Sequence, residues 1–168
     1  FINGSSTAHI SVTGEPGNQG FHCISGGNVH LSYVDFDGLG TLNYKGWGLT
    51  GAVTIYEADA EIFKCTFRNN TCEDALNTVK CNVHVDMIEV SDTYADGYDA
   101  DYCELVCENS SFKNLGNDGL DFSGSQVSIN HCVIDNATDK GVSGGEDSDV
   151  MMGNSTVVNS NIAVASKD

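Results

Sequence analysis

Positive charge is scarce in this chain of 168 residues, in which 7 Lys and Arg stand against 24 Asp and Glu and the formal net charge is −17. A protein that binds nucleic acid needs a basic surface, so this function is excluded. The same charge argues against an anionic membrane surface, and against anionic glycans unless a cation bridges them.

Proline and long apolar runs are lacking as well. The chain has 1 Pro against 19 Gly, so its many turns are built without proline. No run of about 18 apolar residues occurs, and we therefore expect no insertion into a membrane. The hydrophobic content of 40% excludes a disordered chain, and the length suits one domain with a sizeable core.

A recognisable metal motif is missing among the seven cysteines. Cys103 and Cys107 form an isolated CxxxC without a matching cluster of histidines. A disulfide scaffold fits poorly, because a domain of this length does not need covalent cross-links. The odd number leaves at least one free thiol unless another chain takes it.

What the chain does contain is a repeat of about 22 residues. Residues 83–90 follow the pattern apolar, x, apolar, x, x, apolar, x, apolar, which predicts two short strands with a bend between them. Six copies of the pattern begin at Val29, Ala60, Val83, Leu105, Val127 and Val150. Chance is a poor explanation for so many copies.

A turn residue follows each copy at the same distance. These residues tolerate the left-handed conformation of a sharp turn, and they are Gly38, Asn69, Asp92, Asn114, Asn136 and Asn159. We expect them to stack in one column, with Asn114 buried and hydrogen-bonded inside it. A third strand follows the turn, beginning at positions 74, 96, 118, 140 and 162.

Three short strands per repeat predict an all-β fold, a right-handed parallel β-helix (solenoid) of about six to seven rungs. We expect residues 1–168 to form a single β-helix domain, irregular before residue 53 and carrying a loop over residues 38–52. The last rung has no polar cap segment, which indicates either a piece of a longer protein or an end covered by something else.

Equivalent positions on neighbouring rungs should stack about 4.8 Å apart. Cys81 and Cys103 are 22 residues apart and hold equivalent positions, a spacing that permits a disulfide. Cys65, Cys107 and Cys132 fall on inward apolar positions and are expected to be plain core residues.

Three segments carry a family resemblance: NDGLDFSGS at 117–125, DKGVSGGE at 139–146 and ASKD at 165–168. They resemble the right-handed parallel β-helices of the pectate-lyase-like superfamily, most closely the β-helix modules of secreted or surface bacterial proteins. The resemblance implies a secreted or cell-surface location and a role with polysaccharides. The motifs of polygalacturonase-type hydrolases are absent, and so is a pectate-lyase-type catalytic Arg, since the sole Arg68 lies beside a turn.

An outward face of the third strands is the predicted binding site. Because side chains alternate along a strand, Asn77, Asp99 and Asp121 should point outward. We expect them to bind a polysaccharide over a face kept low by Gly or Ala at positions 75, 97, 119 and 141. Asp101 shares this face, so Asp99, Asp101 and Asp121 are candidate Ca²⁺ ligands. The resemblance implies that such an ion would bridge an acidic sugar; the other interpretation is a solvated acidic face.

A second acidic column consists of Asp74, Asp96 and Asp118, followed by Lys140. Short polar side chains at bends commonly bond neighbouring backbone N–H groups, so we expect a structural column that ends in an Asp118–Lys140 ion pair. Lyase chemistry needs a base, and Lys167 is the best candidate catalytic residue in a chain with no recognisable catalytic set.

Two functions stay open. The first is an extracellular, carbohydrate-associated β-helix that binds or processes a polysaccharide along its acidic face; as an enzyme it would be a polysaccharide lyase or a glycoside hydrolase. The alternative is a non-catalytic structural or adhesive surface module that stacks end to end. Ice binding is set aside, because the outward positions 61, 84, 106, 128 and 151 are too mixed for a flat Thr array.

Overall fold

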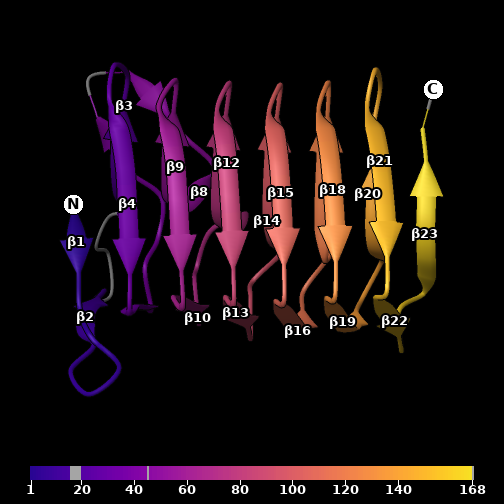
Figure 1. Ribbon diagram of the computed structural model, residues 1–168, viewed down its shortest axis with the longest axis horizontal. Helices are drawn as coiled ribbons and strands as arrows, with labels where there is room; N and C mark the ends of the chain where they lie inside the picture. The colour runs from indigo at the N-terminus through magenta and orange to yellow at the C-terminus, as the bar shows by residue number, and fades with distance from the viewer. Residues whose placement is uncertain (16–19, 45, 168) are drawn as a thin grey trace.

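The computed structural model describes residues 1–15, 20–44 and 46–167, and in this part the chain forms a parallel β-solenoid of about six rungs. Each rung has about 23 residues and contributes one strand to each of three parallel sheets. Figure 1 shows the rungs side by side along the long axis, with the first strands at one end and the last strands at the other. The predicted fold class is confirmed.

Sheet 1 contains the strand that opens each copy of the repeat. Its strands, in hydrogen-bonded order, are β1 (Ile2–Asn3), β4 (Asn28–Ser32), β9 (Asp59–Phe63), β12 (Asn82–Asp86), β15 (Glu104–Glu108), β18 (Gln126–Asn130) and β21 (Asp149–Gly153). Sheet 2 holds the strand after the bend. It contains β2 (Ile10–Thr13), β5 (Val34–Asp37), β10 (Thr66–Arg68), β13 (Glu89–Ser91), β16 (Ser111–Leu115), β19 (Val133–Ala137) and β22 (Thr156–Val158).

Sheet 3 is built from the predicted third strands and two earlier ones. It contains β3 (Phe21–Ile24), β8 (Gly51–Tyr56), β11 (Asp74–Val79), β14 (Asp96–Asp101), β17 (Leu120–Ser123), β20 (Lys140–Gly144) and β23 (Ile162–Ser166). The predicted loop carries a small antiparallel hairpin, β6 (Asn43–Tyr44) with β7 (Trp47–Gly48). Strands β1 and β3, which complete the irregular first rung, were not predicted.

The register of the rungs follows the apolar pattern. Val83 pairs with Ala60 on one side and Leu105 on the other, and Leu105 pairs with Val127. All four side chains are buried. Repeating the same apolar position in every rung therefore gives one continuous core, because each rung can bury its interior only against its neighbours.

Several of the hydroxyl groups inside this core have hydrogen-bond partners. Ser110 and Ser155 stand in an inward column beside cysteine and isoleucine, and their hydroxyl oxygens accept hydrogen bonds from the backbone N–H groups of Ile88 (3.2 Å) and Cys132 (2.9 Å). The Tyr98 hydroxyl lies 3.0 Å from that of Thr78. Buried hydroxyl groups without such partners would destabilise the fold.

Each rung turns at three corners, and from β4 onward a left-handed residue occupies every one. The first corner, between sheets 1 and 2, holds Tyr33, Lys64, Met87, Asn109, His131 and Asn154. The second corner, between sheets 2 and 3, holds the predicted column from Gly38 to Asn159. The third corner, before sheet 1 begins again, holds Ser25, Glu57, Lys80, Tyr102, Gly124 and Asp147, and φ at the three corners ranges from 44° to 70°. The Asn, Asp and Gly pattern predicts the second corner only. The other two were missed because tyrosine, methionine and lysine do not mark a left-handed position.

The predicted asparagine column is present at the second corner. The Asn114 side-chain amide donates to Asp92 Oδ1 (2.9 Å), and the Asn136 amide donates to Asn114 Oδ1 (3.2 Å). Asn159 instead donates to Asp135 Oδ1 (2.8 Å). The expectation that Asn114 is buried is wrong, because a corner residue with positive φ directs its side chain into solvent, and Asn114 is exposed.

Asn114→Leu should lower the free energy of unfolding by about 1–2 kcal/mol, chiefly because leucine adopts the left-handed conformation at a cost of this size. Urea unfolding of both proteins measures the change. Asn114→Gly is the control. Glycine keeps the left-handed backbone conformation and loses only the exposed hydrogen bonds of the Asn114 side chain, so this variant should be less destabilised than Asn114→Leu. A leucine variant as stable as the wild type would contradict the assignment.

Candidate functional site

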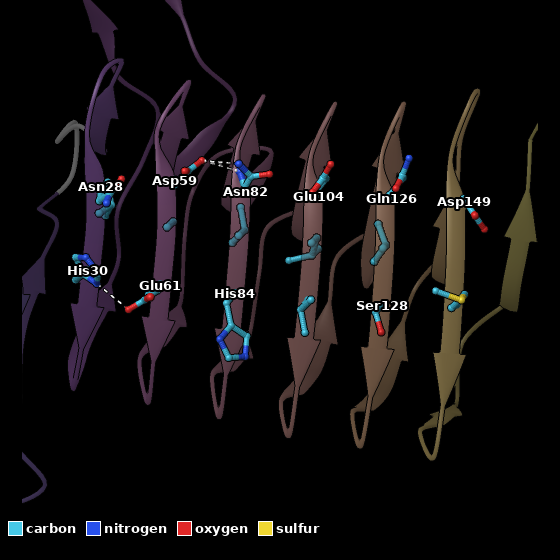
Figure 2. Close-up of a pocket in the computed structure, with 17 residues that line it drawn as sticks. Asn28, His30, Asp59, Glu61, Asn82, His84, Glu104, Gln126, Ser128 and Asp149 are labelled. Atoms are coloured by element: carbon cyan, nitrogen blue, oxygen red, sulfur yellow. Dashed lines mark hydrogen bonds and ion pairs between the residues drawn. The ribbon is translucent and has the colours of Figure 1, made fainter.

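The outer face of sheet 1 carries a groove of about 600 Å³ that crosses the rungs from β4 to β21. Figure 2 shows the labelled polar side chains projecting from successive strands along it. The groove forms because alternate residues of each strand face outward, and stacked rungs bring the same positions into rows. Two rows line it, here called the first row and the second row.

The first row consists of the residue at the start of each strand: Asn28, Asp59, Asn82, Glu104, Gln126 and Asp149. All six are exposed. The Asn82 side-chain amide donates to Asp59 Oδ1 at 2.9 Å, and the Asn82 backbone N–H donates to the same oxygen at 3.1 Å (Figure 2). The row therefore offers carboxylate and amide groups to a ligand in the groove.

The second row lies two residues further along each strand and is more varied: His30, Glu61, His84, Val106, Ser128 and Met151. His30 Nδ1 lies 2.8 Å from Glu61 Oε2 (Figure 2), and the ring of Phe1 stacks on the His30 ring at 4.4 Å. Val106 and Met151 are exposed and add two apolar side chains to this row, on either side of Ser128.

The charge of the groove is one-sided. Among the residues that the structure describes, its lining contains four carboxylates and two histidines but no Lys or Arg. It can therefore accept hydrogen bonds from hydroxyl or ammonium groups, whereas an anionic ligand would be repelled unless a cation intervened.

The predicted binding residues lie elsewhere, on the outer side of sheet 3. Asn77 is 2% exposed, and its amide donates to Asp99 Oδ2 at 3.1 Å. Asp121 is half-buried and accepts a hydrogen bond from the backbone N–H of Phe122 (3.0 Å). The three side chains do stack in register, but Asn77 has almost no surface to offer a ligand.

The small residues of sheet 3 have a different role from the predicted one. A Cβ on Gly119 would lie 2.4 Å from the carbonyl oxygen of Gly141 and 2.7 Å from the Ile134 side chain in the core. A Cβ on Gly141 would lie 2.2 Å from the Val157 side chain. These glycines thus let the backbone of sheet 3 pack against the core, and they do not lower an outer face.

Burial dominates the electrostatics of this acidic region. Burial, together with the neighbouring charges of Asp74, Asp101 and Asp121, raises the pKa of the Asp99 carboxyl to about 9. It raises the pKa of Asp74 to about 7, and Asp74 Oδ2 is buried without a hydrogen-bond partner among the described residues. Burial also raises the pKa values of Asp96 and Asp101.

Calcium binding at Asp99, Asp101 and Asp121 stays a prediction. Within residues 1–15, 20–44 and 46–167, no three His, Cys, Asp or Glu side chains are grouped so that they could hold a metal ion. Protonated carboxyl groups are also poor ligands for a hard cation, so the raised pKa of Asp99 would oppose binding at neutral pH.

Asp96 and Asp118 of the second acidic column have the structural role predicted for them, whereas no backbone N–H group among the described residues donates to the Asp74 side chain. Asp96 Oδ1 accepts hydrogen bonds from the Asp118 backbone N–H (2.8 Å) and the Asn117 amide (2.7 Å). Asp118 Oδ1 accepts one from the Lys140 backbone N–H (2.9 Å) and lies 3.3 Å from Lys140 Nζ. The predicted Asp118–Lys140 ion pair is confirmed.

No family model, curated protein or solved structure matches this chain. The structure by itself establishes a parallel β-solenoid with three sheets. The described residues include no helix that is long and apolar enough to cross a membrane.

Lys167 and the cysteines lie outside the groove lining. Lys167 is exposed after strand β23, where its backbone N–H donates to Gly144 O at 2.7 Å. All seven cysteines are free, so Cys81 and Cys103 form no disulfide here. Cys107 and Cys132 are core residues as predicted, with their sulfur atoms 3.8 Å apart.

The groove itself was not predicted. The signal was nonetheless present, because the residue directly before each copy of the apolar pattern is Asn, Asp, Glu or Gln in all six rungs. Reading this position down the repeat, rather than the third strands alone, would have identified the first row.

Proposed function

We propose that this β-solenoid binds a linear polysaccharide lengthwise in the groove of sheet 1, as an extracellular module of the pectate-lyase-like type. The observation that carries the proposal is the continuous groove across six strands, with a row of acids and amides beside the exposed apolar side chains of Val106 and Met151. Sugar rings present hydroxyl groups at their edges and C–H groups on their faces, so polar groups beside exposed apolar side chains suit them. The resemblance of residues 117–125 and 139–146 supports the same class of ligand.

The length of the groove favours a polymer over a small molecule. Strands of one sheet lie about 4.8 Å apart, and this is close to the length of one sugar residue in an extended chain. A chain lying along the solenoid axis would therefore meet an equivalent set of side chains on each rung. The absence of Lys and Arg from the lining favours neutral or cationic sugars over uronic acids.

Val106→Arg is the test of the site. The new side chain would replace an exposed apolar contact in the middle of the groove with a long charged one, so affinity for an oligosaccharide ligand should fall at least tenfold. Screening on arrays of neutral and charged glycans identifies the ligand, and calorimetry measures the affinities.

Val133→Arg is the matched control, since Val133 is exposed to nearly the same extent (46% against 41% for Val106) but lies on sheet 2. This variant should bind like the wild type. Equal losses in both variants, or a wild-type protein that binds no glycan, would overturn the proposal.

Assembly into end-to-end stacks is the second candidate function. The observation that favours it is the group of exposed apolar side chains on strands that have a hydrogen-bonded neighbour on one side only: Met151, Val158, Ile162 and Val164. Such an edge is a template for another strand, and a head-to-tail contact of this kind propagates. Sedimentation should then show association that grows with salt, because salt screens the excess negative charge. A monomer at every salt concentration would reject this function.

A further inference from the structure

The first row of the groove alternates strictly between amide and acid. Along the axis it reads Asn28, Asp59, Asn82, Glu104, Gln126 and Asp149, and these residues stand at the same position on successive strands. One carboxylate therefore recurs on every second rung. Two rungs correspond to a separation of about 9.6 Å along the axis.

These carboxylates are not neutralised by the protein itself. Asp59 accepts hydrogen bonds from the neutral Asn82, while Glu104 and Asp149 form no side-chain hydrogen bond or ion pair within the described residues. No Lys or Arg lines the groove. A ligand that carries positive charge at the matching interval would supply the missing partners as charge-assisted hydrogen bonds.

We propose that the groove is specific for a cationic polysaccharide, a β-1,4-linked chain of amino sugars with free ammonium groups. In a flat β-1,4-linked chain each sugar is rotated by half a turn relative to the one before. The ammonium groups on one edge therefore recur at every second residue, an interval close to two rungs. They would contact Asp59, Glu104 and Asp149, while Asn82 and Gln126 would contact hydroxyl groups between them.

The second row completes the fit. The C–H faces of the sugar rings would pack on Val106 and Met151, which are exposed in the free protein. The inference rests on the proposed function and adds the charge and the repeat of the ligand. An extended basic peptide carries its side chains at a different interval, since residues on one face of a strand recur at about 6.8 Å.

Calorimetry with three β-1,4-linked hexamers tests the inference: glucosamine, N-acetylglucosamine and glucose, in slightly acidic buffer where the amine is protonated. We expect the glucosamine hexamer to bind at least tenfold more tightly than either neutral hexamer. Its affinity should fall at least tenfold in Glu104→Gln/Asp149→Asn, a larger loss than either neutral hexamer shows in the same variant. Glu89→Gln/Glu146→Gln, which removes two exposed carboxylates outside the groove, should bind like the wild type.

The outcomes separate the inference from the function on which it rests. Neutral hexamers that bind as tightly as the cationic one would overturn the inference and leave glycan binding intact. Binding of no hexamer would overturn both. An equal loss of affinity in the two double variants would show that only the net charge of the protein matters, and it would overturn the inference. A hexalysine peptide that binds as tightly as the glucosamine hexamer would overturn it as well.

Discussion

The free energy of unfolding should fall as the pH rises from about 5 to about 9, in contrast to proteins whose carboxylates are stabilised by folding. Folding raises the pKa of Asp74 to about 7 and that of Asp99 to about 9, chiefly through burial. In the unfolded chain both groups titrate near the ordinary value of about 3.9. The folded state therefore holds protons that the unfolded state has released.

The sign follows from this difference. The stabilisation from the two protonated groups is fully present below about pH 4, and it is lost as the pH rises through the folded pKa values. Asp35 and Asp37 act in the opposite direction: their pKa values are lowered in the fold, so their contribution is lost on acidification. We therefore expect greatest stability in mildly acidic solution.

Asp99→Asn should remove much of this dependence and raise the free energy of unfolding at about pH 8 by as much as about 5 kcal/mol, since this pH lies about four units above the unfolded pKa of the carboxyl and each unit is worth about 1.4 kcal/mol. The amide oxygen can still accept the hydrogen bond from Asn77. Urea unfolding at several pH values measures the effect, with the exposed Glu89→Gln as control. A stability profile that is flat, or that rises with pH in the wild type, would contradict the assignment of Asp74 and Asp99 as buried acids.

Lys140→Met should lower the free energy of unfolding by about 3 kcal/mol, because it leaves the Asp118 carboxylate buried without its cation. The side chains of Asp118 and Lys140 are only 2% and 15% exposed, so solvent cannot replace the lost partner. Thermal and urea unfolding measure the loss. Lys113→Met, which removes an exposed lysine on sheet 2, should have little effect.

The double variant Asp118→Asn/Lys140→Met separates the charge from the packing. Its asparagine can still accept the hydrogen bond from the backbone N–H of residue 140, and no charge is left buried. It should recover most of the stability lost in Lys140→Met. A double variant as unstable as the single one would show that the lysine acts through packing of its aliphatic stem.

The register of the core residues could be predicted from the sequence, but the solvent exposure of the outward-facing residues could not. Val83, Leu105 and Val127 repeat at a fixed interval because each must fill the same space between rungs, so their register was predictable. The burial of Asn77 could not be predicted, since the alternation of side chains along a strand shows which side of the sheet a residue faces but not how much of that residue is exposed to solvent. Tyr102 likewise gave no sign of its left-handed backbone.

The same reasoning explains why the candidate site was predicted on the outer face of sheet 3 while the groove on sheet 1 was not predicted. The acidic residues of sheet 3 form a conspicuous pattern because burial constrains them, and Asp96 and Asp118 mainly support the backbone. The first row of sheet 1 varies among four residue types and so lacks an obvious motif. It becomes visible only when Asp59, Glu104 and Asp149 are placed on one line by the fold.

The stacking of rungs also determines how the molecule responds to mechanical load. The backbone hydrogen bonds that join neighbouring rungs run along the long axis, from one strand to the next (Figure 1). A pull on the two ends therefore opposes these bonds directly and strains the terminal rung first, because each rung contacts only its neighbours. The chain would yield rung by rung, and each event would release about 23 residues, or roughly 80 Å of extended chain. A polymer bound along the groove would contact several rungs at once, so it would raise the force needed to separate and unfold them.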